Sequence, residues 1–362
     1  MKIDRLASDS SSGGLRQGWN RFWFSPVEAM QLHRLRVLAG LVFLVWMLAF
    51  TNQQGAFLSL QGWFDRDAYL ELSRKETLVQ SAPAPVGWSI FYLADGNGSL
   101  FQSLYWGGVA IIALFTLGVM PRLTGILTWV VVVSITANPA VSFDADFLMV
   151  ILAFYLMVGY AFMGLWQSGR SPLERIFGPH DALVFTWFRK HRAPAPRSYA
   201  ANFAIRMLQV HFAVVLVASG VAKLQLPDWW AGVAYWYPLH PPFQTTAESY
   251  AREQGYAPLY LAGLSLAQYI ALAWQIGFPA FAWRGGRWRI VLISGGVIGW
   301  LGSLFLLGLP LFGPFYFIGC LSYLRDEEWR RISGWFGNRT GRGAEKPFRA
   351  AADANKIKVG TQ

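Results

Sequence analysis

The side chain best placed to do chemistry is Lys223, which lies at the end of the apolar stretch 203–224 in the run SGVAKL. Ser219, four residues earlier, lies on the same helical face, and Gly220 allows another helix to approach closely. An ionisable group in a membrane span is costly and therefore marks a candidate site. Two interpretations are open: the lysine extends to the membrane surface, or it is shielded from water and acts as a base near neutral pH.

Carboxylates that could pair with this lysine lie at Asp144, Asp146 and Asp228. The first two stand at the start of the apolar segment 147–166, on the side of the membrane where Lys223 is expected. In the first turn of a helix they would also suit the helix dipole, which is the alternative role. If Lys223 is the base, Asp146 or its neighbour Asp144 is the candidate partner.

The other ionisable residues of the apolar segments indicate structural roles. His211 is expected to be a hydrogen-bonded packing residue, because the helix between it and Lys223 separates the two by about 18 Å. Arg34 and Arg36 are expected to contact lipid headgroups. The five His residues and the single cysteine, Cys320, are scattered, so the sequence predicts no metal site and no internal disulfide.

These residues must be positioned by membrane helices. Of the 362 residues, 54% are hydrophobic and 14% are charged, whereas about a quarter are charged in ordinary soluble proteins. This composition excludes a soluble domain, and the apolar residues form blocks of about 15–25, long enough to cross a bilayer. We predict an all-α, polytopic membrane helix bundle of about eight transmembrane helices. The shorter stretch Val86–Ala94 is either an interfacial segment or a partial, re-entrant span. The predicted spans are 35–51, 101–120, 123–137, 147–166, 203–224, 257–283, 289–308 and 311–324.

The charge distribution predicts the orientation. The net charge is +11, and with the N-terminus inside, 23 of the 31 Lys and Arg residues fall on cytoplasmic segments and 4 on outer segments. Because cations collect on cytoplasmic loops, both termini are expected in the cytoplasm, and nucleic acid is not needed as a partner. The outer loops 52–100 and 225–256 are rich in Trp and Tyr. They form either an aromatic belt or a lid over a lipid-soluble ligand.

Three regions follow from this arrangement. Residues 1–31 are predicted as a cytoplasmic N-terminal tail with an interfacial amphipathic segment at Trp19–Phe24. Residues 32–324 form the transmembrane domain. Residues 325–362 are basic and Gly-rich, typical of a disordered cytoplasmic tail.

Three short motifs together resemble a known family. The segment LRVLAG (35–40) resembles the F-R-x-L-x-G signature of vitamin K-dependent γ-carboxylases and of their bacterial relatives, the horizontally transferred transmembrane domain (HTTM) proteins. LGVMPR (117–122) resembles the L-G-x-x-x-R of that family. GVAKL (220–224) followed by DWWAG (228–232) is similar to the carboxylase G-V-K-K-L and D-W-x-x-G, with one extra residue between the halves. The order and spacing agree over about residues 22–324.

The resemblance implies a function and a location. In the carboxylases, the lysine at the position of Lys223 is thought to deprotonate reduced vitamin K, and the active site faces the lumen. The bilayer and a reduced quinone-type lipid are therefore the implied partner and cofactor, in the cytoplasmic (inner) membrane of a bacterium. The charge count also places Lys223 on the outer, periplasmic side.

The departures from the family leave two functions open. Asp146 stands where the carboxylases have a histidine, Trp300 stands where they have a second one, and we expect no luminal domain after the membrane region. One hypothesis is an enzyme that uses Lys223 as a base on a lipid-soluble quinol. The other is a non-catalytic HTTM-like membrane protein that binds lipid or a protein partner, in which Lys223 is paired structurally.

Overall fold

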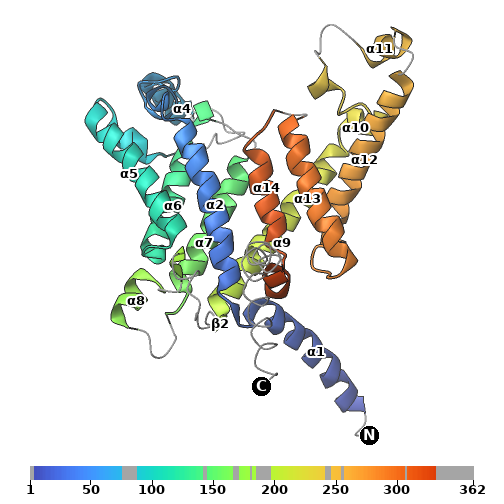
Figure 1. Cartoon of the computed structure of the whole chain (residues 1–362), viewed down its shortest axis with the longest axis horizontal. Coiled ribbons are helices and arrows are strands. Elements are labelled where there is room, and N and C mark those ends of the chain that lie inside the picture. The colour runs from blue at the N-terminus through green and yellow to red at the C-terminus, as the bar shows by residue number, and fades with distance from the viewer. Residues whose placement is uncertain are drawn as a thin grey trace, which may run out of the picture. The chain divides into compact units, whose positions relative to one another are not determined.

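The computed structural model describes residues 4–75, 88–141, 145–165, 171–179, 182–184, 197–240, 246–253, 257–305 and 308–331 (Figure 1). The described chain is mostly helical. The longer helices are α1 (Asp4–Phe24), α2 (Met30–Ala49), α5 (Gly98–Leu117), α6 (Pro121–Thr136), α7 (Asp146–Phe162), α9 (Tyr199–Lys223), α12 (Ala257–Phe281), α13 (Arg287–Phe305) and α14 (Phe312–Leu321). The shorter elements are α3 (Gln54–Leu58), α4 (Arg66–Lys75), α8 (Pro172–Phe177), α10 (Pro227–Ala231), α11 (Ala247–Glu253), and the 3₁₀ helices η1 (Ile90–Ala94), η2 (Pro139–Val141) and η5 (Tyr237–Leu239).

The all-α prediction is confirmed, and so is the general membrane character. By length and composition, α2, α5, α9, α12 and α13 are 5 helices able to cross a membrane, and α6, α7 and α14 are shorter apolar helices. Each predicted span therefore corresponds to one apolar helix among the described residues. The number of crossings and the cytoplasmic placement of the termini stay predictions.

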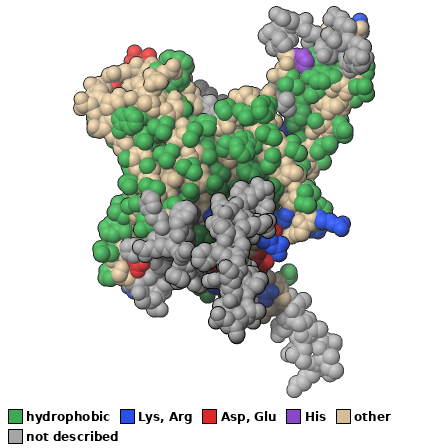
Figure 2. Space-filling model, in the orientation of Figure 1, with side chains coloured by type: hydrophobic (Ala, Val, Ile, Leu, Met, Phe, Trp, Pro, Cys, Tyr) green, Lys and Arg blue, Asp and Glu red, His purple; other side chains and the backbone are tan. Residues whose placement is uncertain are grey.

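The flanks of the helices carry the hydrophobic surface that a bilayer requires. Of the most apolar window of α12, only 11% is buried by the rest of the chain. Leu259, Ile290 and Phe305 are each more than 70% exposed. Figure 2 shows hydrophobic side chains over these helices and basic ones toward their lower ends, where Arg284 and Arg287 are exposed.

The helices pack as neighbours in a bundle. Helix α2 packs against α5 and α14, α6 lies between α5 and α7, and α9 contacts both α7 and α12. The backbones of α2 and α5 touch at Gly40, where an added Cβ would lie 2.1 Å from Thr116 Oγ1. Phe43, Phe212 and Phe315 are among the aromatic residues that fill the core.

Some elements differ from the sequence predictions. Residues of the predicted N-terminal tail form α1, because the apolar residues of its second half recur at helical spacing. The described part of Val86–Ala94 contains the short helix η1, whose start is capped by Ser89 Oγ accepting from Phe91 N. A two-residue antiparallel ladder joins β1 (Val27–Glu28) to β2 (Arg197–Ser198).

The first of the two long connections predicted outside the membrane is tied to the bundle. Asn138 Nδ2 donates to Phe57 O at 2.6 Å, and Ile90 N donates to Ser134 Oγ at 3.1 Å. The described parts of residues 52–100 are therefore fastened to α6 and to the turn that follows it.

The C-terminal residues from Leu324 cluster as a separate unit from Met1–Tyr323. Its described part is helical over 326–331, and Arg325 N donates to Glu328 Oε2 at 2.7 Å at the start of that turn. The predicted disordered tail lies, beyond Arg331, outside the described residues.

Candidate functional site

Helix α9 carries Lys223 as its last residue. The helix begins after Ser198, whose Oγ accepts from Ala201 N at 3.3 Å, and the intervening residues are apolar enough to continue the helix for 25 residues. Gly220 lets the end of α9 lie directly on α12, since a Cβ at this position would be 2.8 Å from Ile276 Cγ1. The predicted close approach of another helix at Gly220 is therefore confirmed, and the partner is α12.

Neutral groups hold the ammonium of Lys223. Its Nζ donates to Gln275 Oε1 at 2.7 Å and to Ser219 Oγ at 3.1 Å, and it lies 5.3 Å from the centre of the Trp229 ring. Gln275 belongs to α12 and Trp229 to α10, so three elements meet at this nitrogen. An ammonium has three N–H donors, and two of those of Lys223 are used by Gln275 and Ser219. The third has no acceptor among the side chains and carbonyls of the described residues.

The chain that follows Lys223 runs along α12. Gln268 Nε2 donates to Trp229 O at 2.9 Å, and Ser265 Oγ donates to Gly232 O at 2.7 Å. Farther on, His240 lies against the ring of Tyr260, with centroids 5.9 Å apart. The contacts thus move steadily toward the start of α12 as the chain proceeds.

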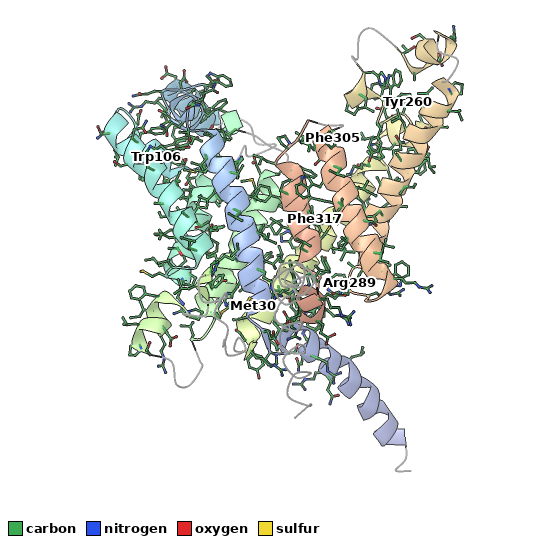
Figure 3. The ribbon with its side chains drawn as sticks, in the orientation of Figure 1. Met30, Trp106, Tyr260, Arg289, Phe305 and Phe317 are labelled. Carbon is green, nitrogen blue, oxygen red and sulfur yellow. The ribbon has the colours of Figure 1, made fainter. Side chains whose placement is uncertain are left out.

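Lys223 lies far from the N-terminal end of α12, toward which residues 224–240 run. At 1.5 Å per residue, Gln275 lies about 27 Å along the helix from Ala257 and about 9 Å from Phe281. Figure 3 labels Tyr260 near the upper end of α12 and Arg289, in α13, near the opposite end. The end of α9 is therefore not at the same level as the start of α12, and residues 224–240 line α12 instead of leaving the bundle at once.

The aromatic side of the site is formed by Trp229, with Tyr235 behind it. Tyr235 packs edge-on against Trp229 with ring centroids 5.7 Å apart. Burial raises the pKa of the Tyr235 phenol, so this group stays protonated at neutral pH. The lysine is thus bordered by amide and hydroxyl oxygens on one side and by aromatic faces on the other.

The predicted carboxylate partners are not brought to Lys223. Asp146 is the first residue of α7 and is half-buried there, in agreement with a helix-dipole role. Asp228 is exposed on α10, and its backbone oxygen accepts from Gly232 N and Val233 N. Among the described residues, no carboxylate forms an ion pair with Lys223, whose partners are Gln275, Ser219 and the Trp229 ring. Asp144 lies outside the described residues.

Two other predicted positions have packing roles. His211 Nδ1 and Tyr155 Oη are 3.0 Å apart, which confirms His211 as a hydrogen-bonded packing histidine. Trp300 stacks obliquely on Phe317, and its Cδ1 would lie 2.2 Å from a Cβ added at Gly313. Trp300 therefore fastens α13 to α14.

A second polar cluster, at the end of the bundle where α2 begins, was missed as a cluster. Arg36 is fully buried, so the expected contact with lipid headgroups is wrong for this residue. Its Nη1 donates to Tyr160 Oη at 3.1 Å and its Nη2 to Ala182 O at 2.6 Å. His33 Nδ1 lies 2.6 Å from the same Tyr160 hydroxyl.

The two motifs 35–40 and 117–122 meet at this cluster. Gly118 adopts φ +83° at the end of α5, and an added Cβ there would lie 2.7 Å from Arg36 Nη2 and 2.2 Å from Ala182 O. Arg122 Nη2 donates to Met163 O at 2.8 Å. The arginines therefore bind backbone oxygens that follow α7, and the motif glycine makes room for one of them.

The sequence held a partial signal for this arrangement. Both arginines lie near the start of apolar helices, within short motifs. Each binds a backbone oxygen of a distant residue, which carries no side-chain signature. Gln275 was missed for a related reason, because a neutral amide in an apolar helix resembles many others until its partner is known.

The two regions can do different chemistry. Around Lys223, a cation with neutral partners and an adjoining aromatic ring can bind the oxygen of a planar, polar ring by hydrogen bonding and stacking. Around Arg36, the polar groups are directed at backbone oxygens and at a buried phenol. That arrangement holds helices and a connecting segment together.

Comparisons with known proteins add one relative. The chain is similar to the uncharacterized protein YitO of Bacillus subtilis (strain 168), with 28% identity over 163 residues that cover 44% of this chain and 47% of that protein. The chain thus matches about half the length of this curated relative. No family model matches the chain. No solved structure matches it either.

Proposed function

We propose that this chain is a multi-pass membrane protein of the HTTM type, in which Lys223 and its neighbours bind the polar ring of a lipid-soluble quinol. The observation that carries the proposal is the ammonium of Lys223, held between α9 and α12 by Gln275 and Ser219 with a third donor left over. An ionisable side chain placed along membrane helices is by default a functional candidate.

The surroundings suit such a ligand. A quinol hydroxyl can accept the third N–H of Lys223, and the ring of Trp229, 5.3 Å from Nζ, offers an aromatic face beside it. The exposed apolar surface of α12 adjoins the site through Gln275 and suits an apolar tail. In its amine form, Lys223 would take the proton of one quinol hydroxyl, which leaves a quinol anion beside the Lys223 ammonium. Gln275 and Ser219 hold that ammonium in position.

The resemblance supports a base more than it supports the whole carboxylase reaction. Lys223 matches the lysine of the carboxylase motif, whereas Asp146 and Trp300 replace its two histidines. We therefore propose quinol binding and deprotonation, and we do not extend the proposal to carboxylation of glutamate.

The test is ligand binding by the purified full-length protein. Menadiol, a short reduced naphthoquinone, is titrated anaerobically while tryptophan fluorescence is followed, with wild type, Lys223→Met and Ser219→Ala. We expect Lys223→Met to weaken binding at least tenfold and Ser219→Ala to weaken it less. A matched control, His211→Phe on the same helix, should bind like wild type. Equal affinity for wild type and Lys223→Met contradicts the proposal.

A second candidate rests on the same hydrogen bond. The Lys223–Gln275 contact of 2.7 Å joins two helices, as a lysine with a purely structural role in a non-catalytic membrane protein would. In that case Lys223→Met lowers the unfolding temperature, and menadiol has no effect on the wild-type unfolding temperature. A ligand-dependent rise that is lost in Lys223→Met favours the quinol site.

We also propose the inner-membrane orientation with both termini in the cytoplasm. It can be tested by labelling because Cys320 is fully buried and gives little background. Asp67→Cys and Arg287→Cys place thiols at two exposed positions. In intact spheroplasts, a membrane-impermeant maleimide should label position 67 and not position 287. Labelling of position 287 in preference to position 67 would reverse the orientation.

A further inference from the structure

An apolar cavity lies at the end of the bundle where α9 begins, away from Lys223. Its volume is about 470 Å³, which is within the usual range of about 300–1,000 Å³ for small-molecule sites. The walls come from the end of α1, the end of α7 and the start of α9, and include Phe24, Val158, Phe162, Phe203 and Ala200.

The α1 wall of the cavity is fixed in place. Asn202 Nδ2 donates to both Phe22 O and Trp23 O at 2.9 Å. The next residue, Phe24, stacks on Phe203 with an interplanar angle of 9° and a centroid distance of 6.3 Å. The cavity is therefore bounded by ordered rings from two helices and is not a gap beside a loose terminus.

The rim of the cavity is polar and carries positive charge. Arg197 lines the cavity with its side chain exposed, directly before α9, and Arg21 lies one turn before Phe24 on α1. Glu28 faces Arg197 in the β1–β2 register. Arg197 is thus the charged residue of the lining, and Arg21 and Glu28 are its charged neighbours along the chain and the ladder. The start of α9 adds the positive end of a helix dipole.

We propose that this cavity binds one acyl chain of an anionic phospholipid, whose headgroup lies against Arg197. The apolar walls of the cavity offer water no hydrogen-bond partners. Charged residues begin at this end of the helices, so the cavity would open near the boundary between the hydrocarbon and the lipid headgroups. The positive rim selects a negative headgroup over a zwitterionic one. This inference does not depend on the proposed quinol site, because the 25 residues of α9 separate the two by about 36 Å along the helix.

The experiment measures binding of defined lipids to the delipidated full-length protein by native mass spectrometry. Phosphatidylglycerol and phosphatidylcholine with identical acyl chains are titrated separately. One cation near a headgroup contributes about 1 kcal/mol, so phosphatidylglycerol should bind about fivefold more tightly. Equal affinities for the two lipids would overturn headgroup recognition.

Variants separate the cavity from its rim. Val158→Trp fills the cavity and should abolish binding of both lipids, and the milder Ala200→Leu should weaken both if the larger substitution prevents folding. Arg197→Gln should remove only the preference for phosphatidylglycerol. The control Val214→Trp lies at a 57% exposed position of α9 and should bind like wild type.

Two outcomes would reject the proposal. Unchanged lipid binding by folded Val158→Trp and Ala200→Leu would show that the cavity is not the site. Displacement of phosphatidylglycerol by an equimolar isoprenoid quinone would assign the cavity to a quinone tail instead.

Discussion

Arg36 and Lys223 are both cations carried by apolar helices, and the protein holds them differently. Arg36 is fully buried and donates to the carbonyl of Ala182 and the hydroxyl of Tyr160. Lys223 is half-buried and donates to two neutral side chains, with one N–H left over. A fully buried cation that binds a backbone carbonyl holds the fold together, whereas a half-buried cation beside an aromatic ring is accessible to a ligand. The following predictions test that distinction.

The largest effect is expected for Arg36→Ala. It takes the Arg36 donor away from the buried Ala182 carbonyl, leaves the Tyr160 hydroxyl with His33 but without Arg36, and opens a cavity, so the free energy of unfolding should fall by about 3–5 kcal/mol. Chemical denaturation in detergent, followed by tryptophan fluorescence, measures the change. Arg287→Ala, at an exposed position, is the control and should unfold like wild type. An Arg36→Ala protein as stable as wild type would show that Arg36 is not needed to hold the fold together.

Gly118→Ala should have the next largest effect. The residue has φ +83°, and a Cβ would meet Ala182 O and Arg36 Nη2, so we expect a loss of about 3 kcal/mol. Gly96→Ala is a matched control, with φ +73° and nothing within 4 Å of the added Cβ. It should cost about 1–2 kcal/mol, from backbone conformation alone. Similar unfolding temperatures for the two variants would contradict the close packing against Arg36.

The Lys223–Gln275 pair should show a smaller coupling. Interhelical hydrogen bonds in membrane proteins contribute about 0.6 kcal/mol on average and up to about 1.7 kcal/mol, so a double-mutant cycle with Lys223→Met and Gln275→Leu should give about 1 kcal/mol. The same variants should weaken menadiol binding more strongly than they weaken the fold. A coupling above about 3 kcal/mol with unchanged menadiol binding would make Lys223 a structural residue like Arg36.

The smallest effect is expected for His211→Phe. The substitution removes one hydrogen bond to Tyr155 and keeps the ring against Phe147, so the loss should be about 0.5 kcal/mol. Quinol binding should not change, because His211 lies far along α9 from the lysine. A large loss of binding would extend the functional region from Lys223 toward α7.

Patterns among residues close together in the sequence predicted the helices and the contacts within one helix. The apolar blocks located the helices, and the four-residue spacing located Ser219 beside Lys223. The hydrogen bond of His211 also followed, because a histidine in an apolar helix needs a polar partner.

The sequence did not predict what depends on the angle between helices. Asp146 lies at the expected helix start, yet α9 ends against α12, so Gln275 takes the place given to Asp146. One acceptor of Arg36 is a backbone oxygen 146 residues away, and no residue type marks a carbonyl. These contacts depend on how α9 crosses α12 and where the chain after α7 returns to the bundle.

The short ladder between β1 and β2 has a consequence for the order of assembly. It ties the residues just before α2 to those just before α9, with Glu28 opposite Arg197. Synthesis proceeds at about 5–20 residues per second, so the second strand emerges roughly 10–35 s after the first. During that interval α2 can insert and pack on α5, but the entrance to α2 has no strand partner until α9 begins. The N-terminal segment is therefore completed late in biosynthesis, although it is made first.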